Sequence, residues 1–426
     1  MKSLPAFLRH LQIPVFCLLL IFTLAPAAVR ADYTPETATR LVADVDARDP
    51  GTSGRLPLIL IHGYSGTSEA LLPLIDGTTA DEKSGFGPMM DTIYDNGLAS
   101  KFQIFRFHYV SNFITDSEIA QGLALRMEQM IAGGQMEDLQ VVLVGHSNGG
   151  LVARAYMEEQ THTAGKYAGK LGGERVIRLI TLGTPHHGSI LANGDARQAD
   201  PPDWQVASTF LNTAFAASAA LTEPNRSDLR WDNYNSLPGY DAPGETNAWL
   251  AALNASSAYL GKIAAYYGST EEADYQLKVL YDYLSTAPAA YSLNVMLVTL
   301  MSGTLPRFES LASPIYYGPY PDDRPFDAHI YQCFLSVAHR RFYSQPNDAY
   351  VSVDSGRGHG LAFLRTEFFS GFDHLQLLQD NSARPAVFAM LATDLSTAWD
   401  LREIEAPPVP PCFLRSLAEP LSAWSR

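Results

Sequence analysis

Four short apolar runs, separated by segments of helical character, constrain the fold of this 426-residue chain more than any other feature. Each run is rich in branched aliphatic or aromatic residues and almost continuously apolar, as expected for strands of a parallel sheet covered on both faces. The predicted strands are residues 56–61, 102–107, 139–144 and 176–182. Helices are predicted between them at residues 116–131, with Asp116 as the N-cap and Gly133-Gly134 as the stop, and at residues 148–160. This alternation predicts an α/β fold with a mostly parallel central sheet and helices on both faces.

A glycine-rich turn directly after the third predicted strand carries the strongest chemical signal. The segment GHSNGG at residues 145–150 joins that strand to a helix. A serine in such an elbow is held in a strained conformation that exposes its hydroxyl, and the glycines let neighbouring backbone approach. The helix N-terminus supplies N–H groups where an oxyanion would form. The pattern predicts Ser147 as a nucleophile; an ordinary glycine-rich turn with an exposed serine is the alternative.

Acyl transfer to a serine needs two hydrogen-bond donors that converge on the developing negative oxygen. The N–H group of Asn148, which follows the nucleophile, is one predicted donor. The N–H group of Tyr64, in the turn HGYSG after the first strand, is the other. We expect His62 and His146, which lie in these two turns, to hold the loops by hydrogen bonding rather than to act as catalytic bases.

Three motifs together resemble the secreted bacterial triacylglycerol lipases and esterases of the α/β-hydrolase fold. They are LILIHG at residues 58–63, GHSNGG at 145–150 and LGTPHHGS at 182–189. The third motif separates this branch from generic esterases. The similarity covers about residues 55–190 and resumes near residue 345. The resemblance implies an α/β-hydrolase fold and a catalytic triad in the chain order serine, acid, histidine.

The same resemblance nominates the other two members of the triad. PNDAYVSV at residues 346–353 resembles the lipases' Asn-Asp-Gly-x-Val segment and nominates Asp348 as the acid. DHL at residues 373–375 resembles their His-Leu segment and nominates His374 as the base. In these roles Asp348 would orient His374, which takes the proton from the serine. Asp354 and His359 are the alternatives.

The sequence departs from those lipases at a metal site. The lipases bind a structural calcium ion through acidic ligands, one of them two residues after the catalytic histidine. Gln376 stands at that position, and a neutral side chain is poorly suited to a hard cation, so we predict no metal and no cofactor. The lipases' disulfide is not carried over, because its cysteine positions do not obviously match. In an oxidising compartment Cys333 and Cys412 can pair, and two free thiols are the alternative.

Residues 1–31 have the three-part pattern of a secretory signal peptide. Basic residues precede an apolar run at residues 13–24, which is too short to span a bilayer, and a stretch of small residues follows. Cleavage is expected after Ala31, with Ala27 as the second choice, and a retained anchor is the alternative. We therefore expect a secreted or periplasmic protein whose mature chain has no integral membrane span.

Composition excludes several classes of protein. The chain carries 30 basic and 45 acidic residues, a formal charge of −15, and has no basic run beyond its N-terminus, which disfavours nucleic-acid binding. With 46% hydrophobic residues and ordinary glycine and proline contents, it is neither disordered, collagen-like nor a coiled coil.

After Ser189 the pattern changes, and residues 190–325 are predicted to form a large inserted helical cap. Its helices are predicted near residues 207–220, 246–267 and 271–284. The expected organisation is a signal peptide (1–31), a first core segment (32–189), the cap (190–325) and a second core segment with a proline-rich tail (326–426). In the second core segment a strand is predicted at residues 330–337 and a final helix from about Leu375.

The predicted function is hydrolysis of lipid-like acyl esters through an acyl-enzyme intermediate. The expected partner is a small-molecule or lipid ester, at a lipid–water interface if the cap is mobile. Acyl transfer or amide cleavage on the same triad is one alternative, because the elbow does not determine which acceptor attacks the acyl-enzyme. A non-catalytic binding scaffold is the other.

Overall fold

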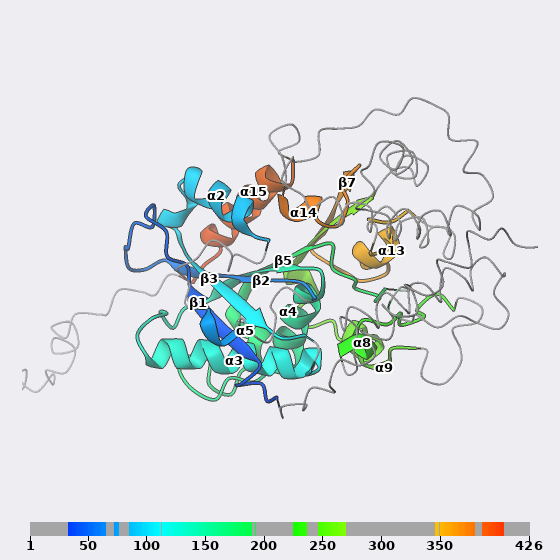
Figure 1. Ribbon diagram of the computed structural model, residues 1–426, viewed down its shortest axis with the longest axis horizontal. Helices are drawn as coiled ribbons and strands as arrows, with labels where there is room; N and C mark the ends of the chain where they lie inside the picture. The colour runs from blue at the N-terminus through cyan, green and yellow to red at the C-terminus, as the bar shows by residue number, and fades with distance from the viewer. Residues whose placement is uncertain are drawn as a thin grey trace, which may run out of the picture.

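A seven-stranded sheet runs through the centre of the computed structural model, with strand order β1-β3-β2-β4-β5-β6-β7 (Figure 1). The structure describes residues 33–64, 72–75, 85–111, 113–189, 192, 225–236, 246–269, 346–348, 350–379 and 386–403. The strands are β1 (Thr39–Ala43), β2 (Leu56–Ile61), β3 (Phe102–Tyr109), β4 (Val141–His146), β5 (Val176–Leu182), β6 (Ile263–Ser269) and β7 (Arg365–Ser370). β1 pairs antiparallel with β3, and every other pairing is parallel.

The strand order reverses at one point along the carboxyl edge of the sheet. The chain passes from β2 to β3 on one side and returns to place β4 on the other side of β2. The carboxyl ends of β2 and β4 therefore flank the point at which the order reverses, which is where open α/β sheets bind ligands. The two glycine-bearing turns identified in the sequence follow these two strands.

Helices cover both faces of the sheet (Figure 1). One face carries α2 (Gly87–Asp95), α14 (Gln376–Gln379) and α15 (Ala386–Asp400), and the other carries α3 (Asp116–Ala132) and α4 (Asn148–Glu159). The short helices α5 (Gly172–Arg175), α8 (Asn225–Asp228), α9 (Ala248–Ala255) and α13 (Val353–Gly356) lie in the connections. Among the described residues, 3₁₀ turns occupy Leu72–Leu74, Leu98–Ser100 and Leu260–Lys262. The predicted α/β-hydrolase fold is confirmed in its sheet and in its two helical layers.

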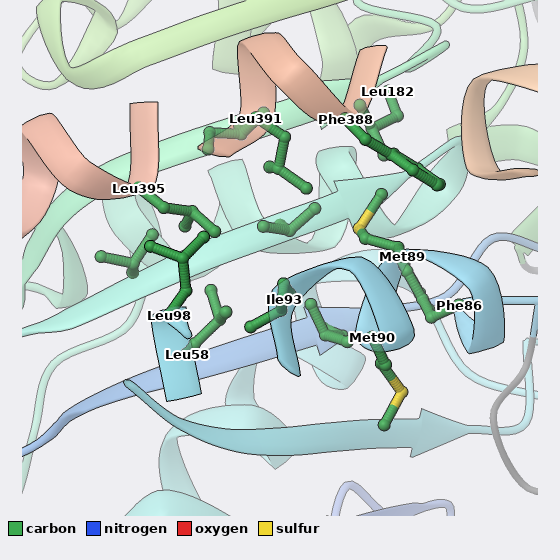
Figure 2. Close-up of a cluster of buried hydrophobic side chains, with 14 of the residues drawn as sticks. Leu58, Phe86, Met89, Met90, Ile93, Leu98, Leu182, Phe388, Leu391 and Leu395 are labelled. Atoms are coloured by element: carbon green, nitrogen blue, oxygen red, sulfur yellow. The ribbon is translucent and has the colours of Figure 1, made fainter. Parts of the chain in front are cut away.

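Alternate residues of each central strand pack into two separate hydrophobic cores, one on each face of the sheet. On β2, Leu58 packs into the core under α2 and α15, whereas Ile59 packs into the core under α3 and α4. Figure 2 shows the first core, where Met89 and Ile93 of α2 and Leu391 of α15 pack on one face of the sheet. Full burial of one such side chain contributes about 1.5–3 kcal/mol, so both faces stabilise the sheet that positions the turns above it.

Helix α3 begins with a capping box that differs from the predicted cap. Thr115, not Asp116, is the N-cap: its hydroxyl accepts from the Glu118 N–H, and the Glu118 carboxylate accepts from the Thr115 N–H. Asp116 is the first helical residue and is completely buried. The predicted stop is confirmed, since Gly133 is the C-cap.

The helix predicted at residues 246–267 is wrong in its second half. Helix α9 ends at Ala255, and Ile263–Ser269 form β6, which pairs with β5 on one side and β7 on the other. The alanines and tyrosines of this run have no strong strand pattern of their own, and burial between two strands decides their conformation. A strand of the central sheet therefore lies inside the range predicted as the cap.

Several predictions fall elsewhere in the chain. These predictions lie outside the described residues: the signal peptide, the cap helices at 207–220 and 271–284, the strand at 330–337, Cys333, Cys412 and the proline-rich tail. The final predicted helix is observed as α14 followed by α15. None of the described helices combines the length and hydropathy that crossing a bilayer requires.

Candidate active site

Ser147 stands alone between β4 and α4 in a strained backbone conformation. Its φ of 52° and ψ of −127° are rare for a residue with a side chain, and its N–H donates to the Leu182 carbonyl at 2.8 Å. Helix α4 approaches the end of β2 so closely that a Cβ on Gly149 would lie 2.3 Å from the Ile61 oxygen and 2.4 Å from the His62 oxygen. Glycine at this position therefore allows the elbow to form as the sequence predicts.

His374 and Asp348 form a buried pair joined by two hydrogen bonds. The Nδ1–H of His374 donates to Asp348 Oδ2 at 2.7 Å, and its backbone N–H donates to the Asp348 carbonyl at 2.8 Å. The second carboxylate oxygen accepts from the N–H groups of Tyr350 at 3.0 Å and Val351 at 2.8 Å. These bonds fix the carboxylate and hold the imidazole with its proton on Nδ1, which leaves Nε2 as the acceptor of the neutral ring.

The turn after β5 brings this pair to the elbow. A Cβ on Gly183 would lie 2.9 Å from His374 Nδ1 and 3.1 Å from Asp348 Oδ2. The preceding residue, Leu182, is the one whose carbonyl accepts from Ser147. Residues from three distant segments of the chain thus meet at the carboxyl ends of β4 and β5.

The alternative acid and base occupy a different hydrogen-bond network. Asp354 pairs with Arg357 at 2.6 Å and accepts from the Tyr234 hydroxyl at 3.1 Å. His359 Nδ1 accepts from the Arg357 guanidinium at 2.7 Å. The acid bonded to His374 is Asp348, so the two residues nominated together by the resemblance are the two in contact.

The turn after β2 lies directly against the elbow. A Cβ on Gly63 would be 2.8 Å from the Cβ of Ser147, so only glycine permits this approach. Asn148 is the first residue of α4, and the N–H of a first helical residue has no acceptor within the helix. The two predicted oxyanion donors, Tyr64 and Asn148, are therefore carried by two segments that both adjoin Ser147.

Two histidines beside the site hold loops, as expected from the sequence. The His62 Nδ1–H donates to the Gly63 carbonyl at 2.6 Å, and its Nε2 accepts from the Tyr109 N–H at 3.1 Å. The His146 Nε2–H donates to the His374 carbonyl at 3.0 Å, and the two imidazole rings lie 4.7 Å apart. Burial lowers the pKa of His62 to about 4 and the pKa of His146 well below its ordinary value.

A second buried His–Asp pair, His187 and Asp232, was not predicted from the sequence. His187 Nδ1 lies 2.8 Å from Asp232 Oδ2, and its Nε2 lies 2.8 Å from the His359 carbonyl oxygen. Both ring nitrogens are occupied, so His187 fastens the loops around the site and has no nitrogen left to act as a base. The pairing joins segments 45 residues apart, and no local motif marks it.

Gln376, at the position where the lipases have an acidic calcium ligand, caps the turn that carries His374. Its Oε1 accepts from the Asp373 N–H at 2.9 Å, and the Asp373 carboxylate accepts from the N–H groups of Leu375 and Gln376. This reciprocal pattern is that of a capping box. Within the described part of the chain, no three His, Cys, Asp or Glu side chains are grouped to hold a metal ion, and the absence of a metal stays a prediction.

The buried histidines predict a loss of stability in mild acid. Burial lowers the pKa values of His62, His146 and His186, so the unfolded chain binds more protons than the folded chain once the pH falls below about 6.5. For His62 alone, whose pKa is about 4, the free energy of unfolding falls by about 2 kcal/mol between pH 7 and pH 5.

Urea unfolding at pH 8, 7, 6 and 5 measures this effect. Between pH 8 and pH 7 these imidazoles are largely neutral in both states, so their contribution there is small and provides the control. Equal unfolding free energies at pH 7 and pH 5 would contradict the burial of neutral histidines.

Comparisons with known proteins agree with an α/β domain. Residues 107–199, which include β4, the elbow, α4 and β5, match the profile of a family described as "PGAP1-like alpha/beta domain". A search of curated proteins found no match. The α/β-hydrolase fold is identified by the chain's own strand order and elbow.

The solved structures to which this chain is similar include three bacterial proteins. The mature Bacillus licheniformis lipase BlEst2 is 14% identical, with 84% of this chain and 98% of that chain covered and a TM-score of 0.42. The Staphylococcus hyicus lipase is 12% identical, with 84% and 97% covered and a TM-score of 0.37. EstA from Clostridium botulinum is 12% identical, with 82% and 89% covered and a TM-score of 0.37.

Proposed function

We propose that this chain is a secreted serine ester hydrolase that cleaves lipid-like acyl esters. The observation that carries the proposal is the meeting of a strained elbow serine with a buried His–Asp pair at the carboxyl edge of a parallel sheet. Export is part of the proposal and is supported by the signal-peptide pattern of residues 1–31.

In the proposed reaction, Ser147 attacks the ester carbonyl while His374 Nε2 accepts its proton. Asp348 stabilises the resulting imidazolium through the 2.7 Å hydrogen bond to Nδ1. The N–H groups of Asn148 and Tyr64 bind the oxyanion, and His374 then protonates the departing alcohol. A water molecule, activated by the neutral His374, hydrolyses the acyl-enzyme and releases the acid.

The sequence motifs and the geometry support this role independently. The lipase-like segments nominate Ser147, Asp348 and His374 from local patterns alone. The hydrogen bond between Asp348 and His374 and the approach of Gly183 to both are long-range contacts that no local pattern contains. A scaffold without catalysis would have no need of a carboxylate that fixes the tautomer of a histidine beside a strained serine.

Hydrolysis of p-nitrophenyl butyrate, p-nitrophenyl octanoate and emulsified triglyceride tests the proposal. We expect turnover of both p-nitrophenyl esters, and the comparison with the emulsion distinguishes an esterase from a lipase. The p-nitroanilide of butyric acid, an amide with the same acyl group, should be turned over far more slowly. Absence of ester turnover above a heat-denatured control would refute the proposal, and faster cleavage of the anilide would indicate an amidase.

A further inference from the structure

We propose that Tyr109 and Asp116 are positioning residues that set the spacing between the two oxyanion donors. This inference rests on the proposed function, because it assigns a role behind the same site. Both residues are completely buried, and neither was nominated by a sequence motif. Tyr109 ends β3, and Asp116 begins α3.

The first donor is held through the side chain of Asn148. That side chain is buried, and its Nδ2 donates to Asp116 Oδ1 at 2.8 Å and to the Tyr109 hydroxyl at 3.4 Å. Asp116 itself is fixed, because its N–H donates to Asp228 Oδ2 at 2.8 Å. Asp116 is the first residue of α3, so its carboxylate also lies at the positive end of a helix dipole. Asn148 therefore holds the first turn of α4 against the start of α3.

The second donor is held through the loop that precedes Tyr64. The Tyr109 hydroxyl donates to the His62 carbonyl at 2.8 Å, and the Tyr109 N–H donates to His62 Nε2 at 3.1 Å. The two rings also stack, with centroids 4.2 Å apart. These three contacts tie the residue two positions before Tyr64 to the end of β3.

The hydroxyl oxygen of Tyr109 connects the contacts that hold the first donor to those that hold the second. The Tyr109 hydroxyl accepts a hydrogen bond from Asn148 and donates one to the His62 carbonyl. The two bonds therefore run in the same direction, and each polarises and strengthens the other. Stabilisation of an oxyanion depends on both donors lying about 3 Å from it. Removal of this oxygen takes away one hydrogen bond on the Asn148 side and one on the His62 side, so it loosens both donors and leaves Ser147 and its base untouched.

Tyr109→Phe is the direct test, and Tyr156→Phe is the matched control. Tyr156 is also completely buried, but its hydroxyl bonds to His162 Nε2 at 2.7 Å in another network. We expect Tyr109→Phe to lower kcat for p-nitrophenyl butyrate about 10- to 100-fold, with KM changed less than about twofold, because the lost interaction acts only in the transition state. We expect Tyr156→Phe to leave kcat within about twofold, and thermal melts of both variants report their stability.

Asp116 is tested by rescue and by coupling. Asp116→Ala removes the acceptor for Asn148 and should lower kcat about 10-fold or more, whereas Asp116→Asn keeps an oxygen there and should recover most of kcat. If both residues act through one contact, the combined Asp116→Ala and Asn148→Ala variant should lose little more than either single variant. Should Asp116→Ala fail to fold, Tyr109→Phe and Asp116→Asn still give the kcat and KM readings.

The outcomes separate this inference from the proposed function. If the wild-type protein hydrolyses the ester and Tyr109→Phe behaves like Tyr156→Phe, the positioning role is overturned and the hydrolase stands. Equal losses in kcat for both tyrosine variants would likewise assign the effect to general destabilisation. If the wild-type protein hydrolyses no ester and a fluorophosphonate does not label it, both proposals fall.

Discussion

Replacement of Ser147 with alanine is expected to abolish ester hydrolysis, with a loss of about 10⁴- to 10⁶-fold in kcat for p-nitrophenyl butyrate. The hydroxyl is the proposed attacking group, and no other serine occupies a strand-to-helix elbow among the described residues. The Ser147 side chain is only partly buried, so its loss should leave the fold intact. Ser100→Ala, at an exposed turn before β3 at the opposite end of the sheet, is the control and should keep full activity.

Steady-state kinetics and thermal melts of the two serine variants are the measurement. A Ser147→Ala protein with the wild-type melting temperature and near-full turnover would remove the nucleophile from the account. Residual activity at the level of the uncatalysed reaction is the expected result.

Loss of the base or of its carboxylate is expected to be nearly as severe. His374→Ala should lower kcat about as far as Ser147→Ala, and the double variant should be no worse, because the two groups act as one unit. Asp348→Asn keeps the shape of the acid but favours the wrong tautomer of His374, and should lower kcat by about 10⁴-fold.

The alternative residues provide matched controls for this second prediction. Asp354→Asn and His359→Ala remove groups that bond to Arg357, and each should change kcat by less than about tenfold. Kinetics of the four variants on one substrate decide the assignment. A larger loss in Asp354→Asn than in Asp348→Asn would move the acid to residue 354.

Much of the fold could be predicted because its signals are local. Strands β2 to β5 are nearly continuous apolar runs, and the elbow needs glycines at fixed offsets from one serine. The observed strand β4 begins two residues later than predicted, at Val141, and β3 extends to Tyr109. Strands β1, β6 and β7 were not predicted. The alanines and tyrosines of β6 become a strand through pairing with β5 and β7, which the sequence does not display.

The residues of the candidate site likewise divide into those that sequence motifs predicted and those that only tertiary contacts reveal. Asp348 and His374 were nominated through their resemblance to lipase segments, since nothing in the local chemistry of residues 346–375 distinguishes them from Asp354 and His359. Asp116 was predicted as a helix cap, and its bond to Asn148 depends on how α3 packs against α4. Contacts across such distances arise from tertiary packing, so no pattern within one segment reveals them.

The central claim is that His374 and Asp348 activate the hydroxyl of Ser147. Incubation of the protein with a fluorophosphonate, followed by proteolysis and mass spectrometry of the peptides, tests this most directly. We expect one adduct, on Ser147, which forms in the wild-type protein and is absent from His374→Ala and from heat-denatured protein. An adduct on another residue, or labelling of Ser147 that proceeds at the same rate without His374, would contradict the account.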